Sequence, residues 1–247
     1  MQQITSVQNP LIKKITSLQT KKGRTELQLF IAEGKRTCTT LLAAGLQPEY
    51  FFSSEHMLEI IGGFVPDPQM IRLVSENVMK KISTGKTPSG IVGVFTIPEQ
   101  KEITLQSGIV LARIADPGNM GTLIRSASAF GLKAVVCVET CDPWSPKVIQ
   151  ATAGTIGFVT VHQISWAELL NSKKDVLLYA LVVSGGKEPH ELSDKNCLLV
   201  IGSEAHGIPN EWLADCEGQI TLPMPGKIES LNAAVAGSIA MYQIFFC

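Results

Sequence analysis

Three segments after residue 110 place polar side chains between an apolar run and a helix-forming run. In the first, residues 114–127, Leu123 and Ala127 recur at helical spacing and mark a core-facing side. We interpret this segment as a strand end, a tight turn and a helix start, which places Arg125 in the first helical turn. The positive end of the helix dipole disfavours a cation there by about 0.3–1 kcal/mol, so Arg125 either faces an anionic or polar substrate or pairs with a surface carboxylate. Asn119 fits a helix cap, the commoner role of asparagine at such a position.

The second segment, residues 198–209, is an apolar strand followed by a loop that contains Gly202, Glu204 and Gly207. Two glycines allow the backbone to approach a ligand closely. The Glu204 carboxylate either accepts hydrogen bonds from amides of its own loop or binds a hydroxyl or amine group of a ligand. His206 is interpreted as incidental, because a lone histidine on a loop more often has no catalytic role.

The third segment, residues 220–237, is a loop stiffened by prolines that leads into a helix with Ser230 as its expected N-cap. Small side chains at residues 233–238 predict close packing of this helix, although Gly237 costs a helix interior about 1 kcal/mol. The apolar run 231–246 is shorter than the roughly 20 residues of a membrane span and contains polar side chains. We therefore predict a buried helix at the end of the chain.

Near-continuous apolar runs alternate with helix-like segments through the later part of the chain. The expected strands there are residues 109–114, 134–138, 158–162, 176–183, 198–201 and 220–222. Because both faces of such strands are apolar, we predict an α/β fold with a mostly parallel sheet and helices on both faces. A smaller α/β region precedes it, with expected strands at residues 27–32, 50–52, 70–74 and 91–97, and a polar boundary at residues 98–102. We predict two domains, residues 1–100 and 104–247.

The composition limits the class of protein and of partner. With 247 residues, 45% of them apolar and 17% charged, the chain can bury a core, which excludes fibrous and disordered classes. A formal charge of -1 leaves no overall basic field, so any contact with nucleic acid must be local. The six cysteines are scattered without a Cys-x-x-Cys pair, which argues against structural zinc and a disulfide framework. No charged-then-apolar leader begins the sequence, and we expect a reduced, cytoplasmic protein without a metal or a membrane span.

Basic side chains gather in the first forty residues. They are Lys13, Lys14, Lys21, Lys22 and Arg24, followed by Lys35 and Arg36. Such a group is either the solvated face of helices or a segment that contacts phosphates.

Together and in this order, the three segments resemble the signature motifs of the SpoU (TrmH-type) branch of the SPOUT RNA methyltransferases. Residues 119–125 match the first motif, residues 202–207 the second, and residues 222–224 with 230–232 the third. The preceding region, with residues 30–36, is similar to the substrate-binding domain that comes before the catalytic domain in members that act on ribosomal RNA.

This resemblance implies transfer of a methyl group from S-adenosylmethionine to a ribose 2′-hydroxyl of RNA, with ribosomal RNA as the expected substrate and a homodimer as the active form. It also implies a deep trefoil knot in the C-terminal segment, a rare exception to the rule against knots. The residues expected to bind the cofactor are Gly202, Leu222, Met224 and Leu231. Those expected to form the catalytic set are Arg125, Asn119, Glu204, Ser230 and Asn232. Those expected to contact RNA are Lys13, Lys14, Arg24, Lys35 and Arg36.

Two roles are open for Arg125 in this chemistry. Proposals for the family make this arginine the group that activates the hydroxyl, whereas a guanidinium is always protonated and is a poor base. The alternative is that Arg125 grips the adjacent phosphate and stabilises the developing alkoxide, leaving the proton to water. Gln150 stands where many family members have arginine, so a positive contact found elsewhere is missing here.

Other functions are also considered. Methylation of transfer RNA is the leading alternative, and a base-methylating SPOUT enzyme is disfavoured by the segment 230–232. A non-catalytic RNA-binding or ribosome-assembly factor would not need the complete set of polar side chains in the three motifs. A Rossmann-type methyltransferase would need a G-x-G-x-x-G turn after its first strand, and the sequence contains none there.

Overall fold

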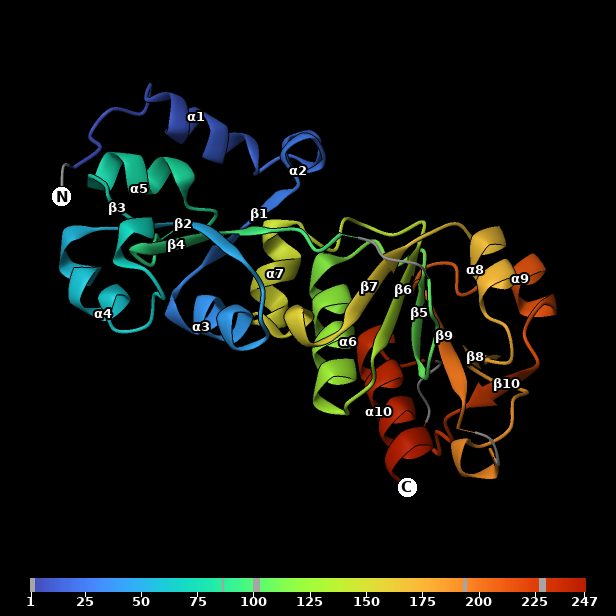
Figure 1. Cartoon of the computed structure of the whole chain (residues 1–247). Helices are drawn as coiled ribbons and strands as arrows, with labels where there is room; N and C mark the ends of the chain where they lie inside the picture. Colours follow the sequence, from blue (N-terminus) through green and yellow to red (C-terminus); the bar gives the residue numbers. More distant parts are fainter. Residues whose placement is uncertain (1–2, 86, 100–102, 193–194, 227–229) are drawn as a thin grey trace. The chain divides into compact units, whose positions relative to one another are not determined.

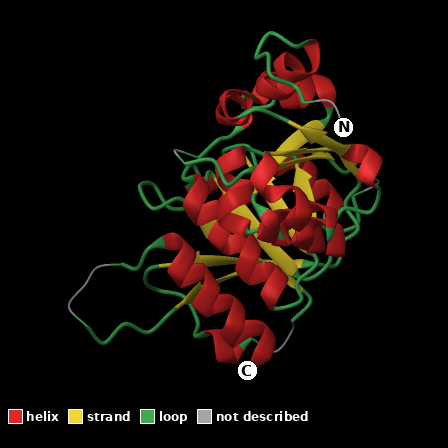
Figure 2. Ribbon diagram, turned by 90° about the vertical axis from the view of Figure 1, so that its left-hand side faces the viewer, coloured by secondary structure: helices red, strands yellow, loops and turns green. Residues whose placement is uncertain are grey.

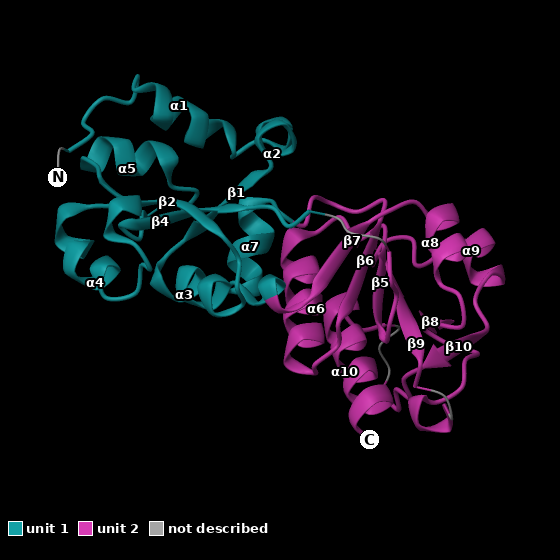
Figure 3. Ribbon diagram, viewed as in Figure 1, with its two compact units in different colours: residues 1–99, 144–157 teal, residues 100–143, 158–247 magenta. Residues whose placement is uncertain are grey.

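The chain folds into two compact units, drawn in different colours in Figure 3. The computed structural model describes residues 1–247 except 1–2, 86, 100–102, 193–194 and 227–229. Unit 1 consists of residues 1–99 and 144–157, and unit 2 of residues 100–143 and 158–247. The first change of unit falls in the polar segment 98–102. The return of residues 144–157 to unit 1 differs from the predicted second domain, which runs without interruption from residue 104.

Unit 1 is built around a four-stranded sheet with the strand order β1-β4-β2-β3. Its strands are β1 (Leu29–Glu33), β2 (Pro48–Ser53), β3 (Ile71–Leu73) and β4 (Ile91–Thr96). The helices of its first segment are α1 (Pro10–Ser17), α2 (Lys21–Leu27), α3 (Lys35–Ala43), α4 (Leu58–Gly62) and α5 (Glu76–Ile82). Antiparallel pairing of β1 and β2 with β4 buries phenylalanines, among them Phe51, Phe52 and Phe95, in the core.

Residues 144–157 complete unit 1. Their helix α7 (Pro146–Thr152) packs against β1, and the ring of Trp144 lies 5.0 Å from that of Phe30. Gly154 has a φ of +87°, and a Cβ atom there would lie 2.6 Å from the carbonyl oxygen of Thr37. Such packing between segments more than 100 residues apart has no local sequence signal, because an amphipathic helix shows the same pattern wherever it packs.

Unit 2 contains a six-stranded sheet with the order β10-β8-β9-β5-β6-β7, in which every neighbouring pair is parallel. The strands are β5 (Gly108–Ala112), β6 (Ala134–Val138), β7 (Thr160–Gln163), β8 (Leu177–Val182), β9 (Cys197–Gly202) and β10 (Gly218–Thr221). The helices are α6 (Pro117–Ala129), α8 (Trp166–Ser172), α9 (Asn210–Ala214) and α10 (Ala233–Phe246). The predicted α/β class, with a parallel sheet and a smaller preceding unit, is confirmed.

Helices cover both faces of this sheet (Figures 1 and 2). Side chains alternate between the two faces of a strand, and one set of them, including Val110 and Val200, forms a core with Trp166 of α8 and Trp212 of α9. On the other face α6 and α10 pack against each other. The trefoil knot implied by the resemblance stays a prediction.

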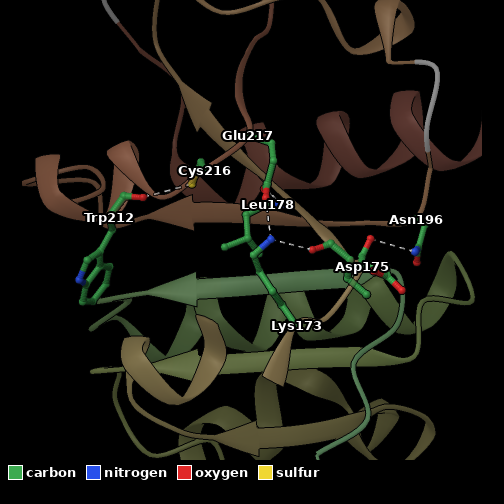
Figure 4. A network of polar contacts seen from close by, with 8 residues as sticks. Lys173, Asp175, Leu178, Asn196, Trp212, Cys216 and Glu217 are labelled. Carbon is green, nitrogen blue, oxygen red and sulfur yellow. Dashed lines mark hydrogen bonds and ion pairs between the residues drawn. The ribbon is translucent and has the colours of Figure 1, made fainter. Parts of the chain in front are cut away.

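A group of polar contacts holds the edge strand β10 at its start (Figure 4). Glu217, the residue before β10, accepts hydrogen bonds from the Leu178 backbone nitrogen and the Lys173 ammonium group, both at 2.6 Å. Although burial raises the pKa of the Glu217 carboxyl group, the hydrogen bonds from Lys173 and Leu178 lower it more. The carboxylate therefore fixes β10 against β8, and with it the loop that follows β10.

The C-terminal helix α10 docks through small side chains, as its composition predicts. Ser238 and Ser126 of α6 share a hydrogen bond of 2.7 Å between their hydroxyl oxygens. A Cβ atom on Gly237 would lie 2.6 Å from the Leu123 Cδ2 atom and 2.8 Å from the Ile201 Cδ1 atom. In the described part of the chain, neither α10 nor any other helix is long and apolar enough to span a membrane.

The docking of α10 can be tested with Gly237→Ala. We expect this substitution to lower the free energy of unfolding by about 1–2 kcal/mol, because overpacking against two buried side chains outweighs the helix propensity that alanine gains. Urea denaturation measures the change. The matched control is Gly62→Ala in α4, where nothing lies within 4 Å of the added Cβ atom. Equal stabilisation by both substitutions would show that α10 is not tightly docked at Gly237.

Candidate functional site

A pocket of about 500 Å³ opens in unit 2 where β8, β9 and β10 end. Carboxyl ends of parallel strands are where α/β folds place their ligands, because the loops that follow diverge there. The side chains that line the pocket are mainly apolar. They are Leu181, Val182, Val183, Ile201, Ile208, Leu213, Leu222, Met224, Leu231, Ala233 and Ala236, with Gly202, Ser203, Glu204, Gly207, Ser230 and Asn232.

The structure brings together most of the residues proposed from the sequence. All four expected cofactor-binding residues, Gly202, Leu222, Met224 and Leu231, line the pocket. Sequence reasoning missed the wall formed by residues 181–183, the end of β8 and the residue after it. The sequence does contain a signal for this wall. The apolar run 176–183 is a predicted strand, and its carboxyl end falls at the same edge of the parallel sheet as the carboxyl ends of the other strands.

Gly202 is required by a close backbone approach. A Cβ atom there would lie 2.4 Å from the carbonyl carbon of Gly207, a distance that no real Cβ adopts. The loop closes on itself at this point, with the Gly207 backbone nitrogen donating to the Ser203 carbonyl oxygen at 2.8 Å. Gly207 has a φ of +65°, a left-handed conformation that favours glycine. These two glycines allow a tight loop that presents Glu204.

The side chains of Asn119, in the first turn of α6, and Asn232, at the start of α10, both meet the Glu204 carboxylate. The Asn119 side-chain amide donates to Glu204 Oε1 at 2.9 Å. The Asn232 side-chain amide donates to the same oxygen and also to Asn119 Oδ1, the latter at 3.1 Å. The Ala233 backbone nitrogen lies 3.4 Å from Glu204 Oε1. Glu204 thus accepts amide hydrogen bonds, as in the first of the two roles considered, but the donors belong to the starts of α6 and α10 and not to its own loop.

Two expectations about helix caps are wrong. The N-cap of α10 is Asn232, not Ser230, because Asn232 Oδ1 accepts from the backbone nitrogens of Ala234 and Val235 at 2.9 and 3.2 Å. The N-cap of α6 is Asp116, which accepts from the Asn119 backbone nitrogen at 2.8 Å. The side chain of Asn119 is therefore not used as a cap and bonds Glu204 instead.

Arg125 lies in the third turn of α6, not in the first as the spacing suggested. The helix begins at Pro117, so the dipole argument for an anion near Arg125 does not apply. Its side chain is exposed and forms no hydrogen bond or ion pair with any residue that the structure describes. It is not among the described residues that line the pocket. An exposed guanidinium without a partner in the fold is available for an external anion.

The basic residues of unit 1 divide into two groups. Lys13 and Lys14 on α1 and Lys35 and Arg36 at the start of α3 are exposed. Arg24 is only 4% exposed and donates to the Leu18 carbonyl oxygen at 2.7 Å, so the expectation that it contacts RNA at the surface is wrong.

Charge is divided unequally between the two units. Unit 1 has twelve Lys and Arg residues against eight Asp and Glu residues, a formal charge of +4, and unit 2 has nine against fourteen, a formal charge of -5. The charge of -1 for the whole chain therefore conceals a basic unit. Among the described residues, no group of three or more His, Cys, Asp or Glu side chains could hold a metal ion.

Fold and site together define an α/β protein that binds a ligand at the carboxyl ends of parallel strands. Residues 106–242, more than half of the chain, match the model of the SpoU rRNA Methylase family, and residues 9–93 match an MRM3-like substrate binding domain. The chain belongs to the SpoU rRNA methylase family, as its motifs predicted.

Similar proteins extend over nearly the whole chain. The 23S rRNA (guanosine(2553)-2'-O)-methyltransferase RlmP of Bacillus subtilis is 28% identical, and the match covers 99% of both chains. The S-adenosylmethionine-bound rRNA methyltransferase of Sinorhizobium meliloti has a TM-score of 0.86 at 27% identity, over 98% of this chain and 97% of that one. A structure described as an RNA 2'-O ribose methyltransferase has a TM-score of 0.77 at 29% identity, over 98% of both.

The two roles of Asn232 can be separated with Asn232→Asp. Aspartate keeps the oxygen that caps α10 but loses the donor to Glu204 and sets a second carboxylate beside it. We expect the free energy of unfolding to fall by about 1–2 kcal/mol at pH 7. The two carboxylates repel each other through partly exposed surroundings, so the loss should become smaller at high ionic strength, where salt screens the repulsion.

Chemical denaturation of the Asn232→Asp variant and the native chain at pH 7, at low and at high salt concentration, measures this difference. Asn232→Ala is the control, since it removes both the cap and the donor without adding a charge and should lose the same stability at both salt concentrations. A loss in Asn232→Asp that does not change with salt would contradict the contact between Asn232 and Glu204.

Proposed function

We propose that this chain transfers the methyl group of S-adenosylmethionine to a ribose 2′-hydroxyl of ribosomal RNA. The observation that carries the proposal is the pocket at the ends of β8, β9 and β10, whose polar edge is the set Asn119, Glu204 and Asn232. Support also comes from a relative named as a 23S rRNA 2'-O-methyltransferase and from a similar structure that holds S-adenosylmethionine. The proposal places the reaction in the cytoplasm.

The pocket residues fit this cofactor. A volume of about 500 Å³ lies within the usual range of small-molecule sites, and Leu222 and Leu231 offer apolar contact for an adenine ring. Gly202 and Gly207, which approach each other closely, place the backbone of their loop at the pocket wall. When bound, S-adenosylmethionine supplies an electrophilic methyl group. The protein then needs mainly to align the attacking oxygen with it, because correct positioning alone lowers the barrier greatly.

Arg125 acts on the RNA in this proposal. Its guanidinium is always protonated, so it stabilises the developing alkoxide and the adjacent phosphate and does not remove the proton. Its exposure and its freedom from any partner among the described residues support this role. Asn119, Glu204, Asn232 and Ser230 orient the ribose and the cofactor from the other side of the site.

Unit 1 supplies the RNA contact through Lys13, Lys14, Lys35 and Arg36. Their exposure and the formal charge of +4 on unit 1 support this part of the proposal, since phosphate contacts dominate the affinity for RNA. The match of residues 9–93 to a substrate binding domain supports it independently. Gln150 lies in unit 1 and is exposed, where it adds no charge to this surface.

The active form is a homodimer joined through unit 2, and the C-terminal segment is knotted. Exposed apolar side chains form a stripe along α10 at helical spacing, namely Val235, Ile239, Tyr242 and Phe246. Tyr242 and Phe246 lie against Phe130, the residue after α6, at ring distances of 5.7 and 5.5 Å in tilted arrangements. No charged residue occurs in α10, and a contiguous group of exposed apolar side chains marks an interaction surface. A second copy of this chain covers the stripe, because most soluble oligomers are symmetric homo-oligomers.

Methyl transfer can be measured with tritiated S-adenosylmethionine and ribosomal RNA from cells that lack this protein. We expect label on a ribose 2′-oxygen of ribosomal RNA. Arg125→Ala should lower the transfer rate by about 100-fold and leave the cofactor dissociation constant within about threefold, since a transition-state donor is lost and the pocket is intact.

Lys133→Ala is the control, because it removes another exposed cation of unit 2. Label on a base, or on transfer RNA in preference to ribosomal RNA, would contradict the proposed reaction. Loss of cofactor binding in Arg125→Ala would contradict the role of Arg125.

The dimer can be tested with Ile239→Glu in α10. We expect sedimentation equilibrium to show a dimer for the native chain and a monomer for the variant, because a buried unpaired carboxylate at the interface is costly. Ile60→Glu is the matched control, since Ile60 and Ile239 are both 40% exposed and Ile60 lies in unit 1. A native chain that is monomeric, or dissociation by both substitutions alike, would contradict the interface on α10.

A further inference from the structure

Two residues with left-handed backbone lie one position past the ends of neighbouring strands. Arg113 follows β5 with a φ of +56°, and Glu139 follows β6 with a φ of +53°. Glycine adopts this conformation freely, whereas other L-residues adopt it at a cost in free energy. Their side chains form an ion pair, with Arg113 Nε donating to Glu139 Oε2 at 2.7 Å. This pairing is a contact that glycine could not make at either position.

Arg113 also contacts helix α9. Its guanidinium carbon lies 4.9 Å from the centre of the Trp212 ring, within the range of a cation–π interaction. The Trp212 ring stacks on Trp166 at 4.7 Å with an interplanar angle of 5°. Trp166 Nε1 donates to Asp215 Oδ2 at 2.8 Å, just after α9. The Trp212 carbonyl oxygen accepts from Cys216 Sγ at 3.3 Å (Figure 4). Arg113 thus contacts a helix whose orientation is well fixed.

This contact borders the pocket without entering it. Leu213, the neighbour of Trp212 in α9, lines the pocket together with Ile208 from the loop before α9. Arg113 precedes Asp116, the N-cap of α6, by three residues. It therefore stands at the start of the loop that leads into α6, and it touches the helix that follows the loop of Glu204. The first turn of α6 and the loop of Glu204 are joined by the hydrogen bond from Asn119 to Glu204.

We infer that Arg113 is a positioning residue for the cofactor pocket. Held by Glu139 and lying over Trp212, it fixes α9 and the loop 203–209 relative to the start of α6. It thereby sets the pocket wall at Ile208 and Leu213. The inference rests on the proposed function, since it takes S-adenosylmethionine as the ligand of the pocket.

The test uses Arg113→Gly in the full chain. Glycine suits the φ of +56°, so the variant should keep its stability while losing both side-chain contacts. Calorimetry should show a dissociation constant for S-adenosylmethionine about tenfold higher, and methyl transfer should lose at least about tenfold in kcat/KM, because small displacements of a binding wall have large effects. Hydrogen–deuterium exchange should become faster in residues 203–213, including the Gly207 amide that donates to Ser203.

Two further variants make the result specific. Lys174→Gly is the matched control, because Lys174 is exposed, belongs to unit 2 and has a φ of +49°, and it should leave affinity, rate and exchange within about twofold. Arg113→Lys keeps a cation beside Glu139 but loses the planar group over Trp212, and it should raise the dissociation constant about threefold.

The outcomes separate this inference from the proposed function. If the native chain does not bind S-adenosylmethionine, the proposed function is contradicted. The hydrogen–deuterium exchange of residues 203–213 in Arg113→Gly still tests whether Arg113 fixes this segment. Arg113→Gly that matches Lys174→Gly in exchange and affinity overturns the inference. If Arg113→Gly does not fold, Arg113→Lys with native affinity and native exchange overturns it equally.

Discussion

One carboxylate oxygen, Glu204 Oε1, joins the starts of helices α6 and α10 to the loop that follows β9. It accepts the side-chain amides of Asn119 and Asn232 and lies near the backbone nitrogen of Ala233. The three segments follow three different strands, β5, β9 and β10, and these side-chain hydrogen bonds connect them across the ends of the sheet. Hydrogen bonds to a charged acceptor are roughly twice as strong as those between neutral groups. The geometry of the pocket edge therefore depends on this one acidic side chain.

Asn232 links that hydrogen-bond network to the packing of the C-terminal helix. Its Oδ1 atom caps α10, while its amide group faces Glu204, so the helix cannot shift without disturbing the loops. The position of α10 is set in turn by the absence of a side chain at Gly237, which lets Leu123 and Ile201 approach. Small residues such as Gly237 lower the helix propensity of α10. They also allow the close packing that holds Asn232 in place at the start of this helix.

The parts of this arrangement that could be predicted are those with a local signal. The strands of unit 2 follow from uninterrupted apolar runs, and the pocket residues after β9 and β10 follow from the resemblance of two segments to family motifs, whereas the wall at the end of β8 has no such motif. The predicted turn for Arg125 is wrong because Asp116 and Pro117, a capping residue and a proline at the first helical position, start α6 earlier than the apolar spacing alone indicates. Ser230 and Asn232 are both good caps, and only the fold decides which one precedes the first helical turn. The burial of Arg24 and the packing of Trp144 on Phe30 depend on contacts that no local pattern encodes.

The unequal charge of the two units explains how a nearly neutral chain can bind both a polyanion and a cationic cofactor. A formal charge of +4 on unit 1 attracts a phosphate backbone, while -5 on unit 2 suits a sulfonium and repels RNA that is not already held elsewhere. RNA then meets an unfavourable electrostatic field near the pocket. In the proposed reaction the exposed guanidinium of Arg125 on α6 offsets this field locally. Arg125 has this property among the described residues, since it forms no ion pair within the fold that would neutralise it. In the proposed reaction this free cation therefore offsets the acidic field of unit 2 for the incoming RNA.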